Sequence, residues 1–516
     1  MLAPLLILAR AVWPLIGRPG AVGRILFWAA LEQEDFALAG AVLKRLDADA
    51  QPDSDWTRRA RLMLENRRPV DPDGLRGLLG PAPIPAPAPP GAPLAYVLAG
   101  SLPLMRQGYA LRSQALAQAL VAAGQPLTCL TRPGFPQDWP GYRGSDQDGN
   151  RGAAPPETSC VDAIAYRHLP EPRQDRLGLE AWLTSAGTVL ARELAAHSPA
   201  VVMAASNHRT ALPALIAARR LGLPFIYEMR GFWELTQLAR NRGFARTAAF
   251  RNAVALESLT AAEADLVFAQ TQAMQDELVR RGVTPGRIRL LPNACDLDRF
   301  APAPRDGALA AGLDLPEAVP VIGYVGSFTG YEGLDDLILA CAGLMRRGLD
   351  FRLLLVGDEF LHHPDQVPIT PRLQALIRRT GIGDRVRMPG RIAPGEVPRW
   401  YSLIDIAPLP RKPLAVTELV APLKPLEAMA MGKTVIASDV AALAETVRHE
   451  RTGLLFARGD VAALEAALAR ALTEPALRAR LGAAGRAWVQ AERSWTGMAE
   501  QVRAAVSDLA GQGRQD

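Results

Sequence analysis

The chain has 516 residues, of which 49% are hydrophobic, and a formal net charge of +5. This length predicts about two to three domains of roughly 150–200 residues in a globular α/β protein, because single cores rarely grow larger. The small charge, without a long Lys/Arg block interleaved with aromatic residues, excludes a typical nucleic-acid-binding protein. Four scattered cysteines argue against a disulfide framework or a zinc site and favour a reducing, cytoplasmic location.

The first stretch, residues 1–31, is apolar but is interrupted by prolines and by Arg10, Arg18 and Arg24. It lacks the run of about 20 apolar residues that a membrane-spanning helix needs. Three cations and no acidic residue before Glu32 instead fit peripheral contact with an anionic lipid surface, such as the inner face of a membrane. A helix packed on its own domain is the alternative interpretation.

Helical patterns dominate the chain up to about residue 68. Apolar residues from Phe36 to Leu46 form a stripe with helical spacing, and residues 56–64 indicate a second helix. We therefore predict a helical N-terminal extension over residues 1–80. The run PAPIPAPAPPGAP at 81–93 can form neither helix nor sheet and is typical of a semi-rigid linker.

From residue 94 onward, short apolar strands alternate with helices of roughly 10–15 residues, which predicts doubly wound parallel sheets. The alternation comes in two sets, so the fold class is α/β with two Rossmann-like domains facing each other across a cleft. We expect these domains at 94–300 and 301–490, and a C-terminal helix and tail at 491–516. The predicted strands lie at 94–99, 127–131, 201–205, 225–228, 266–269, 319–326, 351–358, 386–388, 404–407 and 434–437.

Polar residues follow two strands of the first set. His208 comes after 201–205, and Glu228, Arg230 and Glu234 come at and after the end of 225–228. Two carboxylates and a guanidinium at a strand end are costly to bury unless they are paired or used. We interpret these three as a cluster that faces a substrate, with a structural ion-pair network as the alternative.

In the second set, Arg411 and Glu418 lie in a stretch of irregular-loop composition that leads into a short helix. Pro425 favours the first turn of that helix, which places Lys424 and Glu427 at its N-terminus. Ligands of open α/β sheets lie beyond the carboxyl ends of strands and against helix N-termini. A cation there suits a phosphate and a carboxylate suits sugar hydroxyls. The alternative is that Lys424 is solvated and Glu427 only favours the helix N-terminus.

Five segments between residues 95 and 495 match, in order, the motifs of one known family. They resemble glycosyltransferase family 4, the retaining group with the two-Rossmann GT-B fold. The segments are Gly108-Tyr109 before a helix, LPNACDLDRF at 291–300, YVGSF with YEGLD at 324–335, LLVGD at 354–358, and PLEAMAMGK at 425–433 followed by TGLLF at 452–456.

This resemblance implies transfer of a sugar from a nucleotide diphosphate-sugar to an acceptor hydroxyl, with retention at the anomeric carbon. It also implies no cofactor and no obligatory metal, so that basic side chains must stabilise the leaving diphosphate. The 94–300 domain would bind the acceptor, and the 301–490 domain the donor. The acceptor would be a glycan or a lipid-linked sugar in surface polysaccharide, lipopolysaccharide or glycolipid synthesis.

The charge patterns described above and the resemblance together give the candidate site residues. The catalytic candidates are Arg411, Lys424, Glu418, Arg230 and His208. The donor-binding candidates are Gly326, Ser327, Lys424, Glu427 and Leu426, where Glu427 matches the second glutamate of the paired-glutamate motif. The acceptor-side candidates are Gly108, Tyr109, Glu228 and Glu234.

The chain departs from the family pattern in two places. The first glutamate of the pair falls on Leu419, with Glu418 one position away. The Arg and Lys expected after the first strand of the second domain are replaced by Ser327 and an acidic stretch with Glu332, so neutralisation of the diphosphate falls to Arg411 and Lys424. A sugar-nucleotide epimerase or hydrolase, and a non-catalytic nucleotide-sugar-binding scaffold, are the alternative functions.

Overall fold

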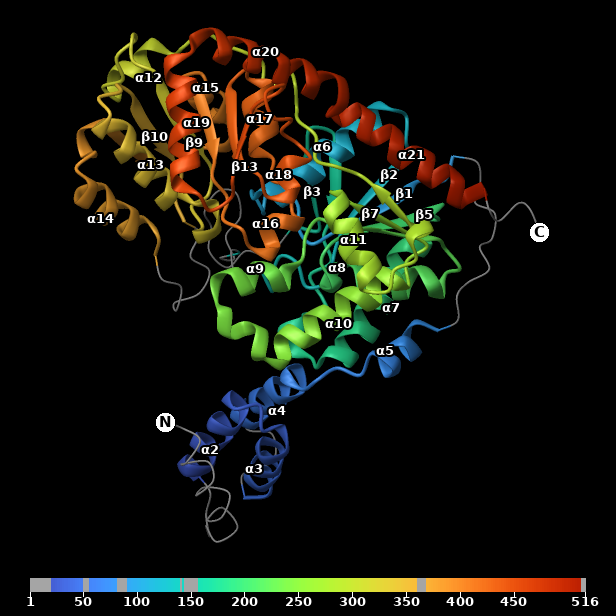
Figure 1. Cartoon of the computed structure of the whole chain (residues 1–516). Helices are drawn as coiled ribbons and strands as arrows, with labels where there is room; N and C mark the ends of the chain where they lie inside the picture. The colour runs from blue at the N-terminus through green and yellow to red at the C-terminus, as the bar shows by residue number, and fades with distance from the viewer. Residues whose placement is uncertain are drawn as a thin grey trace.

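The computed structural model describes residues 20–49, 55–80, 91–139, 142, 156–359 and 368–511. Two α/β domains lie against each other, and a small group of helices projects from one of them (Figure 1). Residues 1–19 and the linker residues 81–90 lie outside the described residues. The predictions of a membrane contact at the N-terminus and of a semi-rigid linker therefore stay predictions for those residues.

The N-terminal domain is built on an eight-stranded sheet with the strand order β3-β4-β2-β1-β5-β6-β7-β8. Neighbouring strands are parallel except for β3 and β4. The sequence did not predict β3, β4 and β8, because these strands are short and partly exposed and have no strong apolar pattern. The strands are β1 (Leu94–Leu98), β2 (Leu127–Thr131), β3 (Thr158–Val161), β4 (Ile164–Arg167), β5 (Val201–Ala205), β6 (Phe225–Glu228), β7 (Leu266–Ala269) and β8 (Ile288–Leu290).

Helices cover both faces of this sheet, so every residue of β1, β5, β6 and β7 is buried. Trp182 and Leu215 belong to the apolar core on one face, and Leu116 and Val502 to the core on the other. The helices of the domain are α6 (Gly108–Ala122), α7 (Leu179–His197), α8 (His208–Arg220), α9 (Trp233–Arg240), α10 (Ala248–Ala262) and α11 (Gln272–Arg280).

The C-terminal domain has an all-parallel six-stranded sheet with the order β11-β10-β9-β12-β13-β14. Its strands are β9 (Val321–Val325), β10 (Arg352–Val356), β11 (Val386–Gly390), β12 (Ile406–Leu409), β13 (Thr434–Ser438) and β14 (Leu454–Phe456). Its helices are α12 (Gly307–Gly312), α13 (Leu334–Arg346), α14 (Thr370–Thr380), α15 (Val397–Tyr401), α16 (Ala415–Leu419), α17 (Lys424–Ala430), α18 (Ala441–Ala444), α19 (Val461–Thr473) and α20 (Pro475–Glu492).

The segment between β12 and α17 differs from the irregular loop that its composition predicts, because it contains α16. Thr417 explains this short helix. Its hydroxyl accepts a hydrogen bond from the Leu414 N–H (3.0 Å) and lies 2.5 Å from the Lys412 carbonyl oxygen, which fixes the turn before the helix. The next helix, α17, begins at Lys424 with Pro425 in its first turn, as predicted.

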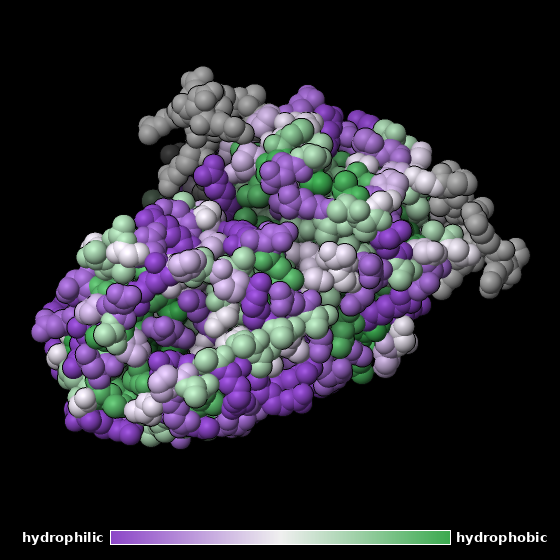
Figure 2. Space-filling view, turned by 90° about the horizontal axis from the view of Figure 1, so that it is seen from above, coloured by the Kyte–Doolittle hydropathy of each residue, from purple (hydrophilic) through white to green (hydrophobic). Residues whose placement is uncertain are grey.

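The chain passes between the domains twice, and the two crossings lie side by side. Cys295, on the first crossing, donates a backbone hydrogen bond of 2.9 Å to the carbonyl of Arg493, on the second, and forms an isolated bridge with Ser494. After the second crossing, α21 (Trp495–Gly511) returns to the N-terminal domain and packs on α6. Figure 1 shows α20 and α21 running along the top of both domains. Seen from above, this surface is mostly hydrophilic, with apolar residues in small groups (Figure 2).

The N-terminal helices form a module with its own small core that includes Phe27, Val42 and Leu64. The module is attached to α10, because Glu34 accepts a hydrogen bond from the Ala248 N–H and pairs with an arginine of that helix. No helix in the described ranges combines the length and the apolar character needed to span a bilayer. The helices are α2 (Gly20–Glu32), α3 (Phe36–Asp49), α4 (Asp55–Arg67) and, closer to the sheet, α5 (Pro72–Leu79).

Candidate active site

The two domains meet at the carboxyl ends of their strands. Thr271, after β7, donates a hydrogen bond of 2.8 Å from its hydroxyl to the carbonyl of Leu419, and Asn293, after β8, donates one of 2.8 Å to the carbonyl of Ala421. The carboxylate of Glu445 accepts from two backbone N–H groups in the first turn of α11. These contacts bring the sheet edges that bind ligands in open α/β folds to one interdomain region.

On the C-terminal side, one buried carboxylate holds two of the predicted cations. Glu332 Oε1 lies 3.2 Å from Arg411 Nη2 and 3.4 Å from Lys424 Nζ. Burial raises the pKa of Glu332, but the charges of Lys424 and Arg411 outweigh burial and hold it below its usual value. Two cations and one carboxylate leave this trio, which we call the Glu332 cluster, with one net positive charge.

Arg411 is nearly fully buried, and its Nη1 donates to the carbonyl of Val420 (2.8 Å). Its Nε and the second oxygen of Glu332 are buried without a hydrogen-bond partner among the described residues. Lys424 retains some exposure, at 19% of its side chain, and its Nζ lies 5.3 Å from the centre of the Tyr324 ring. The Glu332 cluster therefore has a buried, rigid cation and a second cation that can still reach a ligand.

Gly326, directly after β9, is required for the position of Lys424. Its φ of +150° suits glycine, and a Cβ atom added there would lie 2.2 Å from Lys424 Cε. The Gly326 N–H donates to the carbonyl of Val356 (2.9 Å), so it is not free for a ligand. The N–H of Ser327, an exposed residue, makes no hydrogen bond with any described residue and remains the donor of this loop.

Glu427 lies in the first turn of α17 and is half-buried. Tyr401 donates a hydrogen bond to its carboxylate. Burial raises the pKa of Glu427 above its usual value, even though the charges of Lys424 and Arg299 act in the opposite direction. Leu426, its neighbour, is buried and lines an interdomain cavity of about 10 Å³, which is barely large enough for one water molecule.

The structure places Glu418 against α18. One of its carboxylate oxygens accepts from the N–H of Ala441 (2.8 Å), and the other accepts from Arg458 (2.5 Å). Both oxygens are thus engaged within the C-terminal domain, and the position where the family has its first glutamate, Leu419, is buried. Glu418 is the one catalytic candidate of this domain that lies outside the Glu332 cluster, and its carboxylate contacts Arg458 and Ala441 instead.

On the N-terminal side, Glu228 and Arg230 belong to one buried network. The Glu228 carboxylate pairs with Arg230 (2.9 Å) and with Arg112 of α6 (3.1 Å), and it accepts from the Tyr96 hydroxyl (2.5 Å). Burial raises the pKa of Glu228, but Arg230 and Arg112 outweigh it and hold the pKa below its usual value. Arg112 also donates to Asn293, so the network reaches the residue that contacts the other domain.

Every nitrogen of the Arg230 guanidinium has a partner. Nη1 donates to the Tyr109 carbonyl (3.0 Å) and the Ser113 hydroxyl (2.9 Å), while Nε and Nη2 reach Glu228 and Tyr96. The guanidinium also lies 4.4 Å from the centre of the Tyr109 ring. The pKa of Arg230 is raised, because the neighbouring carboxylate outweighs burial. This arrangement is the structural ion-pair network that the sequence left open as an alternative.

The remaining candidates of the N-terminal domain are Gly108, Glu234 and His208. Gly108 is the first residue of α6. Glu234 is fully buried and pairs with Arg281 of α11 at 2.7 Å, away from the Glu228 network, and burial raises its pKa. His208 opens α8, and its Nδ1 lies 2.9 Å from the buried carboxylate of Glu257. A carboxylate at Nδ1 fixes the ring orientation and leaves Nε2 for a ligand.

Sequence analysis missed several residues that complete these groups. Glu332 was recognised only as a departure from the family pattern. Since its loop has no lysine or arginine of its own, the sequence could have suggested an ion pair between Glu332 and Lys424 or Arg411. Arg112, Glu257 and Tyr401 carry no local signal, because each lies in an ordinary helical segment and meets its partner only in the folded chain.

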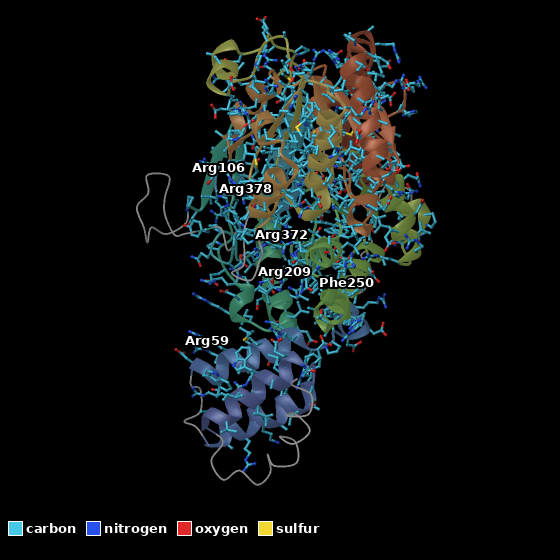
Figure 3. All side chains as sticks on the ribbon, turned by 60° about the vertical axis from the view of Figure 1, so that its left-hand side comes forward. Arg59, Arg106, Arg209, Phe250, Arg372 and Arg378 are labelled. Carbon is cyan, nitrogen blue, oxygen red and sulfur yellow. The ribbon has the colours of Figure 1, made fainter. Side chains whose placement is uncertain are left out.

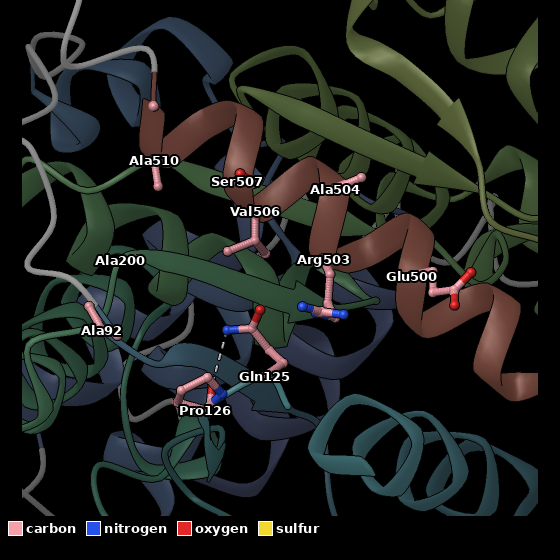
Figure 4. A pocket seen from close by; sticks show the side chains of 12 residues that line it. Ala92, Gln125, Pro126, Ala200, Glu500, Arg503, Ala504, Val506, Ser507 and Ala510 are labelled. Carbon is pink, nitrogen blue, oxygen red and sulfur yellow. Dashed lines mark hydrogen bonds between the residues drawn. The ribbon is translucent and has the colours of Figure 1, made fainter. Parts of the chain in front are cut away.

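A larger cavity lies elsewhere. It has a volume of about 560 Å³ and lies between α21 and the amino ends of β1, β2 and β5, with Gln125, Pro126 and Arg503 in its lining (Figure 4). It is on the opposite side of the sheet from the carboxyl ends, and most of its lining is small side chains and backbone. In the described ranges, no group of three His, Cys, Asp or Glu side chains could hold a metal ion. The expectation of a metal-independent reaction stays a prediction.

Solved structures share this architecture. A sucrose-phosphate synthase from Thermosynechococcus elongatus matches with a TM-score of 0.64 and 23% identity, over 81% of this chain and 100% of its own. HepE from Anabaena, solved in complex with UDP, matches with a TM-score of 0.59 and 16% identity over the same shares. The fold is therefore the GT-B fold of glycosyltransferases, with two parallel-sheet domains and a helical N-terminal region.

Two family models cover both domains. Residues 308–488 match the model of glycosyl transferases group 1, and residues 107–294 match the glycosyl transferase 4-like domain. The chain belongs to the group 1 glycosyltransferases of the family 4 type, and it is an enzyme. This outcome confirms the resemblance seen in the sequence.

Two curated relatives of this chain are glycosyltransferases by name. D-inositol 3-phosphate glycosyltransferase 2 from Catenulispora acidiphila is 28% identical over 337 residues, which are 63% of this chain and 76% of the relative. The GDP-mannose-dependent alpha-(1-6)-phosphatidylinositol monomannoside mannosyltransferase from Mycobacterium tuberculosis is 30% identical over 218 residues, which are 42% of this chain and 54% of the relative.

The Glu228 network predicts a large loss of stability in Glu228→Gln. The substitution leaves two buried guanidinium groups without their carboxylate, so we expect the free energy of unfolding to fall by about 3–5 kcal/mol. Urea denaturation followed by tryptophan fluorescence measures this. Glu180→Gln, at an exposed residue of α7, is the control and should change it by less than about 1 kcal/mol. Equal stability of the wild type and Glu228→Gln would contradict the network's structural role.

The Glu332 cluster predicts a pH dependence. Because the folded pKa of Glu332 lies below the usual value of 4.5, its ion pairs stabilise the fold fully above about pH 4.5 and are lost as the pH falls through the folded pKa. Calorimetry of the wild type and Glu332→Gln between pH 3 and 7 should show a difference in Tm that is largest near pH 7 and shrinks below pH 4.5. A difference that grows on acidification would refute the charged cluster.

Proposed function

We propose that this glycosyltransferase takes its sugar from a nucleotide diphosphate-sugar and transfers it with retention to an acceptor hydroxyl. The observation that carries the proposal is the Glu332 cluster, which sets Lys424 beside the Gly326 turn and at the first turn of α17. A cation, a free N–H and a helix N-terminus meet here at the carboxyl edge of a parallel sheet. Such a position attracts anionic groups.

The chemistry of the leaving group explains the cations. Breaking a glycosyl–diphosphate bond builds negative charge on the diphosphate, and preorganised donors stabilise that charge more than they stabilise the intact donor. Lys424 has N–H groups left after its contact with Glu332, and the Ser327 N–H is free among the described residues. Arg411, buried behind them, sustains the positive potential without moving. In this scheme these groups act without an obligatory metal.

Glu427 supplies the complementary contact. Its carboxylate is half-buried next to Lys424, and it accepts a hydrogen bond from Tyr401. Ionised, it can accept hydrogen bonds from the vicinal hydroxyls of a ribose, as the resemblance implies for this position. The N-terminal domain would then present His208, whose Nδ1 is held by Glu257, toward the transferred sugar and the acceptor.

The names of two relatives suggest the chemical class of the acceptor. One acts on an inositol phosphate and another on a phosphatidylinositol mannoside, as their names state. We therefore propose that this chain acts in glycolipid or surface-glycan synthesis, on a phosphorylated or lipid-linked acceptor.

Nucleotide binding tests the donor site. We expect one of UDP, GDP, ADP and TDP to bind in isothermal titration calorimetry, and Lys424→Met to weaken it at least about tenfold, the worth of a hydrogen bond to a charged group. Gly326→Ala should also weaken it, because the added methyl displaces Lys424. Lys412→Met is the matched control, since Lys412 pairs with Asp335 and Asp336 instead, and it should stay within about twofold of wild type.

The same samples test the role of Glu427 and the stereochemistry. Glu427→Ala should weaken the nucleotide that binds, whereas Glu474→Ala, at an exposed residue of the same domain, should not. With the matching nucleotide-sugar, proton NMR of the product should show the anomeric configuration of the donor. Inversion would exclude retention, and no binding of any of the four diphosphates by folded wild type would overturn the transferase mechanism described above.

We also propose that the N-terminal module lies on an anionic membrane. The outward face of α2 carries Val22, Ile25 and Trp28, which are 55%, 69% and 37% exposed, together with Arg24. An exposed apolar face with a tryptophan and a cation, in a stretch without acids before Glu32, is typical of a helix that lies in a lipid interface. This contact would place the active site near a lipid-linked acceptor at the inner face of the membrane.

Vesicle binding tests this surface. We expect the chain to sediment with vesicles of phosphatidylglycerol and phosphatidylcholine, and less with phosphatidylcholine alone or at high salt. Ile25→Asp should reduce binding at least about tenfold, because it removes one large apolar contact and adds an acid. Leu339→Asp, at an apolar residue of α13 that is 38% exposed, is the control. Equal binding of both variants would show that α2 does not contact lipid.

A further inference from the structure

Arg209 differs from three other arginines at the carboxyl edge of the N-terminal sheet. Arg112, Arg132 and Arg230 each have a carboxylate partner within hydrogen-bond distance. Arg209, the second residue of α8, forms no ion pair with any described residue, and its guanidinium makes no hydrogen bond with one. Its side chain is accessible to solvent, so it can meet a ligand.

The nearest charges leave a positive excess at this place. Arg132, directly after β2, makes a two-pronged pair with Asp138, at 2.7 Å for each of the two contacts. Both partners are largely buried, at 11% and 5% exposure, and together they are neutral. Because β2 and β5 both flank β1, the residues that follow them lie at one edge of the sheet. Arg209 adds an unmatched positive charge there.

Other charged groups act on the guanidinium of Arg209. Burial lowers the pKa of its guanidinium, the charge of Arg132 lowers it further, and Asp138 acts in the opposite direction. The side chain is open to solvent, and the charged groups of Arg132 and Asp138 act on its guanidinium. A cation held there beside a second cation is unfavourable by itself, and an anion would relieve both effects.

Two buried hydroxyls on segments that follow β1 and β5 also lack partners. Thr210 follows Arg209 in α8, and Ser101 lies in the loop after β1, between the ends of β2 and β5; the hydroxyl oxygen of each is buried without a hydrogen bond among the described residues. Native proteins leave few such groups unsatisfied, and those that remain often mark a ligand or functional site. The residue before Arg209, His208, is the histidine held by Glu257.

We propose that Arg209, with Arg132 and Asp138 behind it, binds a phosphate group of the acceptor. This inference rests on the proposed function, and it makes the acceptor a phosphate monoester or phosphodiester rather than a neutral glycan. A guanidinium matches two phosphate oxygens with its planar fork, so it selects phosphate by geometry as well as charge. The donor diphosphate belongs to the other domain, at the Glu332 cluster, and the two anions would not compete.

Figure 3 shows where this residue lies relative to other arginines. Arg209 lies between the helical module, with Arg59, and the C-terminal domain, with Arg372 and Arg378 of α14, on one side of the molecule in this view. Arg106, of the loop before α6, is on the same side. A phosphorylated acceptor approaching from that side meets positive charge from both domains, which favours its encounter with the site.

Binding of defined phosphates tests the proposal on the whole chain. The probes are inorganic phosphate, D-inositol 3-phosphate, inositol as the neutral partner, and phosphatidylinositol in detergent micelles. Each is titrated by calorimetry with the nucleoside diphosphate present at saturation, and again into Lys424→Met without nucleotide, so that the donor site cannot supply the signal. We expect D-inositol 3-phosphate or phosphatidylinositol to bind and inositol to bind at least about tenfold more weakly.

The variants separate this site from the donor site. Arg209→Met should weaken the phosphate ligand at least about tenfold, with nucleotide binding and Tm unchanged, and Arg209→Lys should recover part of the affinity because it restores charge without the fork. Arg59→Met, which removes an arginine of α4, is the control for net charge and should change neither. Binding of the soluble compound identifies a free phosphate ester as the acceptor class, and binding of the micellar lipid alone identifies a phospholipid headgroup.

Three results would overturn the proposal while leaving the proposed function intact. They are nucleotide binding without binding of any phosphate probe, phosphate binding that Arg209→Met does not alter, and loss of nucleotide binding in Arg209→Met, which would assign Arg209 to the donor. Failure of wild type to bind any nucleoside diphosphate contradicts the proposed function instead. In that case the phosphate titration of Lys424→Met still decides the role of Arg209.

Discussion

The constraint on which the fold of this enzyme depends is the burial of charge at the carboxyl edge of the N-terminal sheet. Glu228 is buried, and its charge is tolerated only because Arg112 and Arg230 surround it. Arg112 then reaches Asn293, which contacts the Ala421 carbonyl in the loop before α17. The same network that neutralises the first domain therefore fixes the position of the second, and with it the residues proposed to bind the donor.

Much of the fold could be predicted from the sequence, because buried parallel strands such as β1 and β9 are continuous apolar runs with clear boundaries. The start of α17 could be predicted from Pro425. The partners of the charged candidates could not, since Glu332 and Lys424 are 92 positions apart and meet only in the folded chain. Glu418 shows the same limit: its spacing suggested a donor contact, and its oxygens are used by Ala441 and Arg458.

One departure from the expected family pattern has a structural counterpart. The resemblance predicts a lysine after β9, whereas this chain carries the acid Glu332 in that loop. The Glu332 carboxylate pairs with Lys424 of α17, so a cation from a different segment lies beside the loop. In the function that we propose, Lys424 supplies the positive charge that the loop itself lacks.

The side-by-side crossings at Cys295 and Ser494 have a consequence for how such an enzyme can change. Because α21 packs on the N-terminal domain, the C-terminal domain is topologically an insertion whose two ends emerge at one point. An insertion of this kind can be exchanged as a cassette at two junctions without rethreading the host sheet. With the donor bound by the C-terminal domain and the acceptor by the N-terminal domain, as we propose, the two specificities can evolve as separate modules within one continuous chain.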